Sequence, residues 1–293
     1  MNEKLTSAFQ HLRIRFSFFL MPVYFLALST SGELDFTTAL LGFIILHLLI
    51  YPASNGYNSL MDQDTGSIGG LENPPEAPRV LYPITLIMDG LGLLLAYLVS
   101  PPAALLLLAY ILASRLYSWR AVRIKKYPIL GFLWVIIFQG AMTYWFCISL
   151  FQQEINIFSQ TSSQHLSAMI LASAMIASTY PLTQVYQHEQ DRKDGIFTIS
   201  MLLGIKNTFK FSGLMIMVFT LFLAGYLISF ERWYDIFIFL ILNIPASWHF
   251  YTWNKKVKSN SNNANYKNTM RMSLLGAGGA NLFFIYLSLM NIL

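Results

Sequence analysis

Residues 36–64 read FTTALLGFIILHLLIYPASNGYNSLMDQD, an apolar run that passes directly into a polar and acidic segment. A helix needs about 20 apolar residues to cross the hydrocarbon core of a bilayer, so the stretch 36–54 is predicted to be transmembrane. Asp62 and Asp64 then stand close to the membrane edge. Only 11% of the residues in this chain are charged, so acids gathered at such a place indicate a functional site.

Apolar runs of comparable length recur from one end of the 293-residue chain to the other, and 55% of all residues are hydrophobic. A soluble core of this size needs less apolar surface, so the chain is predicted to be an all-α polytopic membrane protein. Residues 1–293 are interpreted as a single domain. The nine predicted transmembrane helices span residues 15–31, 36–54, 82–99, 102–117, 129–150, 165–184, 210–230, 235–253 and 272–292.

Basic residues are distributed unequally between the two sides of this predicted bundle. They precede the first span and fill the connections after the second, fourth, sixth and eighth spans, whereas the other side carries Arg232 alone. By the positive-inside rule, the basic side and the N-terminus are cytoplasmic and the C-terminus is outside. We expect a cell membrane of the bacterial inner-membrane type. The same rule explains the net charge of +5 without nucleic acid as a partner.

The loops after the second and sixth spans hold most of the remaining acids on the predicted cytoplasmic side. If the preceding helices continue into these loops, Asn58 and Asp62 share one helix face, and Gln187 and Asp191 share another. Two such helix ends, facing each other, would offer oxygen ligands from both sides to Mg²⁺ bound with a phosphate. The alternative is that these are solvated loops whose acids balance neighbouring Lys and Arg residues.

Basic and amide side chains near these acids are candidates for binding the phosphate. Arginine can bind phosphate oxygens in a bidentate way, and lysine acts as a compact positive charge. The candidate phosphate-binding residues are Asn58, Arg79, Gln187, Arg192 and Lys193. The stretch 66–78 between the second and third spans is too rich in Gly and Pro to be helical, and we expect it to form a flexible cover over the site.

Asp89 is the one acid well inside a predicted span. An intramembrane carboxylate is a functional candidate by default, and this one could orient an acceptor molecule or take a proton. The alternative is that Asp89, about two helical turns from the cytoplasmic edge, caps or pairs with a neighbouring helix. The sequence leaves both roles open.

The two acidic loops resemble the paired aspartate-rich motifs of the UbiA-type intramembrane prenyltransferases. The first family motif has the pattern N-D-x-x-D-x-x-x-D and falls on Asn58, Ser59, Asp62 and Gly66. The second has the pattern D-x-x-x-D followed by Gly and a Ser or Thr, and falls on Gln187, Asp191, Gly195 and Thr198. The number of spans, the cytoplasmic motif loops and the basic connection after the fourth span are also similar to the family over nearly the whole chain.

The resemblance implies a UbiA-like helical bundle that uses Mg²⁺ to transfer a prenyl group from an isoprenoid diphosphate. The expected acceptor is a small lipophilic and aromatic molecule of quinone, pigment or lipid biosynthesis, and the bilayer surrounds the prenyl chain. Asp62, Asp191 and Asp89 are the candidate catalytic residues. The candidate metal ligands are Asp62, Asp64, Glu189 and Asp191.

This chain departs from the family pattern at three acid positions. Ser59, Gly66 and Gln187 stand where the motifs carry aspartate, and Asp64 and Glu189 are expected to supply charge at shifted positions. The departures leave the number of metal ions and the acceptor open. Two alternatives therefore remain: prenyl transfer to a non-aromatic acceptor such as haem or a glycerol lipid, and a non-catalytic membrane transporter.

Overall fold

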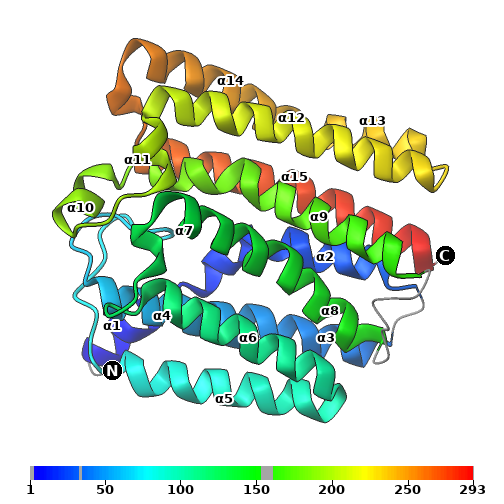
Figure 1. The fold of residues 1–293 in the computed structure, drawn as a ribbon, viewed down its shortest axis with the longest axis horizontal. Helices are drawn as coiled ribbons and strands as arrows, with labels where there is room; N and C mark the ends of the chain where they lie inside the picture. The colour runs from blue at the N-terminus through cyan, green and yellow to red at the C-terminus, as the bar shows by residue number, and fades with distance from the viewer. Residues whose placement is uncertain (1–2, 33–34, 153–160, 293) are drawn as a thin grey trace.

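The structure is a computed structural model that describes residues 3–32, 35–152 and 161–292. Within these ranges it is built from helices, and the helices of the bundle lie side by side with the longest connections at one end (Figure 1). The first part comprises α1 (Glu3–Leu12), η1 (Ile14–Phe19), α2 (Met21–Thr30), α3 (Phe36–Phe43), η2 (Ile44–Ile50), α4 (Tyr51–Asp62), α5 (Leu81–Val99), α6 (Pro101–Ser118), η3 (Ile124–Lys126), α7 (Pro128–Val135), η4 (Ile136–Met142) and α8 (Thr143–Gln152). The second part comprises α9 (Thr161–Thr179), η5 (Tyr180–Gln184), α10 (His188–Lys193), α11 (Ile199–Leu203), α12 (Ile205–Ser229), α13 (Trp233–Leu242), α14 (Ile244–Ser259), η6 (Ser261–Asn263) and α15 (Tyr266–Ile292).

The predicted all-α membrane fold is confirmed, and the count of nine spans is approximately right. Seven helices in the described ranges are long and apolar enough to cross a membrane, and two bent helix pairs raise the number to nine if each pair is one span. The first pair bends by 46° before α2, and the second bends by 50° between α13 and α14. Pro22 and Pro245 are the second residues of α2 and α14. Proline has no backbone N–H, so it interrupts the hydrogen bonds that a continuous helix would need at these places. The predicted spans 15–31 and 235–253 therefore each correspond to a bent helix pair.

The two motif loops begin differently from each other. The helix of the second span does continue into the first motif loop: it runs through η2 into α4 and ends at Asp62, where Gln63 adopts a left-handed conformation with φ of 53°. The sixth span, Ser163–Gln184, agrees with the predicted bounds, but its helix does not continue into the second motif loop. α9 ends at Thr179, the tighter helix η5 follows with Pro181 in its first turn, and α10 is a separate short helix.

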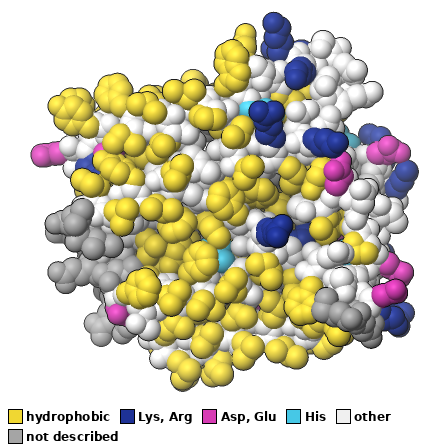
Figure 2. Space-filling model, turned by 180° about the vertical axis from the view of Figure 1, so that it is seen from behind, with side chains coloured by type: hydrophobic (Ala, Val, Ile, Leu, Met, Phe, Trp, Pro, Cys, Tyr) yellow, Lys and Arg dark blue, Asp and Glu magenta, His cyan; other side chains and the backbone are white. Residues whose placement is uncertain are grey.

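Apolar side chains cover the flanks of the bundle, and charged side chains gather mainly at the end where the motif loops lie (Figure 2). Leu98 and Leu105, for example, expose 71% and 70% of their surface. Exposed apolar surface on this scale is typical of helices in contact with lipid. The structure thus supports a multi-pass membrane protein, while the cytoplasmic location of the motif loops stays a prediction.

Candidate active site

A cavity of about 570 Å³ lies between the motif loops and continues between the membrane helices. Its volume falls in the range of sites for small organic ligands. The charged side chains at its polar end are Arg13, Asp62, Asp64, Lys125 and Asp191. The apolar side chains farther along include Ile176, Met217, Phe219, Phe239 and Leu240. One continuous space therefore joins a charged end to an apolar channel.

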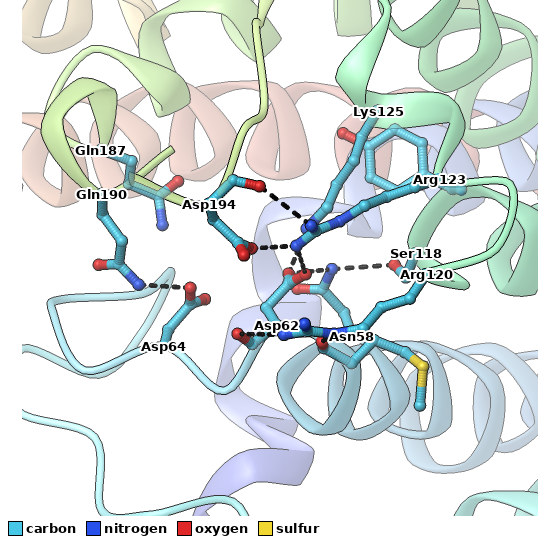
Figure 3. Close-up of polar contacts among 12 residues, drawn as sticks. Asn58, Asp62, Asp64, Ser118, Arg120, Arg123, Lys125, Gln187, Gln190 and Asp194 are labelled. Atoms are coloured by element: carbon cyan, nitrogen blue, oxygen red, sulfur yellow. Dashed lines mark hydrogen bonds and ion pairs between the residues drawn. The ribbon is translucent and has the colours of Figure 1, made fainter. Parts of the chain in front are cut away.

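Asp62, at the end of α4, is the most enclosed acid of the motif loops, with 8% of its surface exposed. Asn58, one helical turn earlier, donates a hydrogen bond of 2.9 Å to its carboxylate, as expected for residues on one helix face. Lys125 binds Oδ2 of the same carboxylate, and Arg123 binds Oδ1 at 3.1 Å (Figure 3). Both oxygens of Asp62 are thus engaged by positive side chains.

Arg123 links the two halves of the site. Its guanidinium binds the carboxylate of Asp194, which follows α10, and also donates to the backbone carbonyl of Asp194 at 3.2 Å. Arg120 from the same connection donates to the carbonyl oxygens of Met61 and Asp62. The connection between α6 and α7 therefore holds the end of α4 and the second motif loop together (Figure 3).

Asp64 and Asp191 face the cavity from opposite loops. Gln190 of α10 donates a hydrogen bond to the carboxylate of Asp64 (Figure 3), whereas no hydrogen bond or ion pair from the described residues reaches the carboxylate of Asp191. Burial raises the pKa of Asp191 to about 7; Lys125 opposes this shift, and the negative charges of Asp64 and Asp62 add to it. Burial, followed by the charge of Asp62, likewise raises the pKa of Asp64 to about 6. Two carboxylates that repel each other across a cavity form a site for a cation.

Arg13 holds the first motif loop over the cavity. Its guanidinium donates to the backbone carbonyls of Gly69 at 3.0 Å and Asn55 at 3.1 Å, and its Nε is buried without a partner in the described structure. Gly69 lies so close to the ring of Phe16 that a Cβ would approach a ring carbon to 2.6 Å. The stretch 66–78 is non-helical, as predicted, and part of it forms a wall of the site.

Four residues predicted from the sequence lie away from the cavity. Glu189 and Lys193 form an ion pair with each other on the surface of α10, at 83% and 75% side-chain exposure. Arg79 and Arg192 are also exposed, and none of the four lines the cavity. Gln187 does line it, and donates a hydrogen bond of 3.3 Å to the carbonyl of Ser67. The arrangement offers no support for the roles predicted for the four exposed residues.

Asp89 pairs with a neighbouring helix. Its carboxylate binds Arg115 of α6. The guanidinium of Arg115 also lies over the ring of Tyr57, with Cζ 4.1 Å from the ring centroid, and donates a hydrogen bond of 3.2 Å to Thr85. Asp89 does not line the cavity described above. Of the two roles that the sequence leaves open, this geometry favours helix pairing, and the predicted catalytic role gains no support.

The sequence interpretation missed Arg13, Arg123, Lys125, Gln190 and Asp194. The basic residues after the fourth span were read only as a sign of topology. No sequence signal distinguished the two residues of this connection that the structure buries. Arg123 and Lys125 are only 8% and 9% exposed, and charges buried to this degree are almost always paired. Their partner Asp62 lies more than 60 residues earlier, however, and no local spacing reports that contact.

The profile of the UbiA prenyltransferase family matches residues 18–275. The chain belongs to this family. The expected enzyme class, a prenyltransferase, is thereby confirmed over a non-catalytic transporter. No curated protein matches the sequence.

Solved structures of UbiA homologues share the fold of this family member over almost its whole length. A homologue from Archaeoglobus fulgidus bound to GPP and Mg²⁺ is 18% identical, with a TM-score of 0.69, and the match covers 98% of this chain and 99% of that one. A homologue from Aeropyrum pernix K1 without ligand is 13% identical, with a TM-score of 0.69 and coverage of 96% and 99%. A structure of digeranylgeranylglyceryl phosphate synthase is 15% identical, with a TM-score of 0.60 and coverage of 99% of both chains. At these identities the likeness shows the fold alone.

Proposed function

We propose that this protein transfers a prenyl group from an isoprenoid diphosphate to a small lipophilic acceptor, and that the transfer requires Mg²⁺. The observation that carries the proposal is the single cavity that joins a charged end to an apolar channel between the helices. Such a space matches a donor with an anionic head and a hydrocarbon tail. Homologues of the same fold have been solved with GPP and Mg²⁺ and with DMAPP and Mg²⁺, which supports this donor class.

The residues at the charged end fit a divalent cation. Asp64 and Asp191 are carboxylates that line the cavity; burial raises the pKa of both, and the charge of Asp64 adds to the shift of Asp191. Asp191 has no hydrogen-bond or ion-pair partner among the described side chains. Carboxylate oxygens, phosphate oxygens and water are the ligands that Mg²⁺ prefers. When bound, Mg²⁺ would neutralise negative charge that develops on the leaving diphosphate.

The chain's own cations face the same place. Lys125 and Arg13 line the cavity, and both would lie beside the oxygens of a bound diphosphate. Positive groups held in fixed positions stabilise the charge that develops as the C–O bond of the donor breaks, and they act most strongly where water is excluded. Lys125 is fixed by Asp62, and Arg13 by two backbone carbonyls. These residues therefore bind and orient the leaving group.

Aromatic rings also lie at the cavity. Tyr117 and Tyr180 line the cavity and share a hydrogen bond of 2.5 Å between their hydroxyl groups, and Phe132 stacks on Tyr180 with ring centroids 6.4 Å apart. The faces of aromatic rings attract a cation. They are suited to a prenyl group with carbocation character, and the apolar channel beyond keeps water away from it.

The acceptor that we propose is an electron-rich aromatic molecule, as in the biosynthesis of quinones or pigments, used at the cytoplasmic face of a cell membrane of the bacterial inner-membrane type. An aromatic carbon is a good nucleophile toward an allylic cation, and the aromatic rings at the cavity can hold a flat ring. A glycerol lipid or haem is the alternative acceptor that product analysis would separate from it.

The proposed activity is tested on membranes that contain the protein. With geranyl or a longer prenyl diphosphate, an aromatic acceptor and Mg²⁺, we expect acceptor-dependent release of diphosphate and a prenylated product by mass spectrometry. EDTA should stop both, and added Mg²⁺ should restore them. Prenylated glycerol lipid or haem would replace the proposed acceptor, and the absence of any acceptor-dependent product would refute the transfer itself.

Cation binding should weaken as the pH falls. The pKa values of Asp191 and Asp64 are raised to about 7 and about 6, so both are ionised above pH 7 and become protonated in turn below it. The Mg²⁺ concentration needed for half-maximal activity should therefore rise roughly tenfold per pH unit below about 7, and more steeply below about 6. Titrations with Mg²⁺ between pH 5.5 and 8 measure this. A requirement that stays constant over the range would contradict the assignment of these two acids.

A further inference from the structure

The two motif loops contain groups that stand in place of the missing acids. Ser59, Gly66 and Gln187 occupy positions at which the family motifs carry aspartate. In the ranges that the structure describes, no three side chains of the types His, Cys, Asp and Glu form a group that could hold a metal ion.

Gln190 fills the space beside Gly66. A Cβ added to Gly66 would collide with Oε1 of Gln190, so an aspartate at that position cannot be accommodated while Gln190 stays where it is. The amide of Gln190 donates to Asp64, and the amide of Gln187 donates to the carbonyl of Ser67. Two neutral amides thus join the loops directly, where two acids would need a shared cation. Figure 3 shows the first of these contacts, between Gln190 and Asp64.

Lys125 fills the space beside Asp62. Its side chain is 9% exposed, and its ammonium group lies on Oδ2 of Asp62, while Arg123 lies on Oδ1. A carboxylate with a positive group on each oxygen, and with an additional hydrogen bond from Asn58, has little capacity left for a metal ion. Lys125 also lines the cavity, so its charge is available to a ligand there.

Unlike the carboxylate of Asp62, the carboxylate of Asp191 has no positively charged partner among the described side chains. It faces the cavity, and neither a hydrogen bond nor an ion pair from the described side chains reaches it. Asp64 faces it with one oxygen bound to Gln190, which leaves the other available. These two acids are the pair that can share one divalent cation with a phosphate.

We propose that the site holds one divalent cation, bound between Asp64 and Asp191. The ammonium group of Lys125, which is paired with Asp62, then supplies the second positive charge that binds the diphosphate. This inference rests on the proposed function, because it assumes a diphosphate ligand at the same cavity. The sequence-based set of metal ligands also contained Asp62 and Glu189, and the proposed cation site leaves these two residues out. A lysine at this place binds the diphosphate whatever the Mg²⁺ concentration.

The first test counts metal ions. The full-length protein in detergent is dialysed against Mn²⁺ and geranyl S-thiolodiphosphate, a donor analogue that resists cleavage, and bound Mn²⁺ and analogue are measured per chain. We expect one Mn²⁺ for each bound analogue. Two Mn²⁺ per analogue would overturn the single-cation site and leave the proposed function standing. Failure of the analogue to bind under any condition would overturn the proposed function as well.

The second test removes the lysine charge. Lys125→Met should bind the analogue roughly 10- to 100-fold more weakly at saturating Mn²⁺, since it loses a charged hydrogen bond, with the Mn²⁺ count per analogue unchanged at one. Lys126→Met is the matched control, because Lys126 lies over the ring of Tyr127 and does not line the cavity; its affinity should equal that of the wild type. Equal affinity in Lys125→Met and the wild type would overturn the role of Lys125.

Discussion

Replacing Asp191 by asparagine is expected to lower kcat/KM for prenyl transfer by about 1000-fold. Asn keeps the shape of the side chain but removes the negative charge, and it leaves Asp64 to hold a divalent cation alone. Asp191 is the acid at the charged end of the cavity that no described side chain neutralises, so its charge is the one most available to a ligand. A 1000-fold loss corresponds to about 4 kcal/mol of transition-state stabilisation, which is the scale of removing a fixed electrostatic group from an active site.

Glu189→Gln is the matched control for this variant. Glu189 lies on the same short helix, loses the same charge, and is 83% exposed in a pair with Lys193. Its kcat/KM should stay within about twofold of the wild type, because exposed ion pairs contribute little. Steady-state rates at several Mg²⁺ concentrations distinguish the two variants. If Glu189→Gln lost as much activity as Asp191→Asn, the sequence-based assignment of Glu189 as a metal ligand would be favoured over the geometry.

The architecture was readable from the sequence because apolar length and charge asymmetry are local properties. The number of spans, the extension of α4 to Asp62 and the shared face of Asn58 and Asp62 all follow from residues close together in the chain. The break at Asn243 was not predicted, although Pro245 lies next to it. Prolines occur in transmembrane helices without always breaking them, so their presence alone did not determine the outcome.

The site was only partly readable because its charge balance depends on contacts between distant segments. The two motif loops predict Asp62, Asp64 and Asp191 as site residues, and all three line one cavity in the structure. Spacing could not report that Lys125 lies on Asp62, because the positive-inside rule already accounted for a basic connection there. The sequence instead predicts Arg192 and Lys193 as phosphate-binding residues, because they are neighbours of the motif in the chain, and the structure exposes both. Proximity in sequence was therefore a poor guide to which cations face the acids.

Replacing Arg123 by methionine is expected to lower the free energy of unfolding by about 3 kcal/mol. Arg123 is 8% exposed and binds Asp62 and Asp194 together. Its removal leaves Asp62 with Lys125 but takes away the positive partner of Asp194, and breaking a buried ion pair on one side is costly. In detergent, the thermal midpoint of the purified protein should fall by about 5–10 °C. Arg192→Met removes the same charge from an exposed position nearby and should change the midpoint by no more than about 2 °C. An unchanged midpoint for Arg123→Met would mean that the link from Asp62 to Asp194 contributes little to stability, and the two motif loops would then need a bound ligand to stay together.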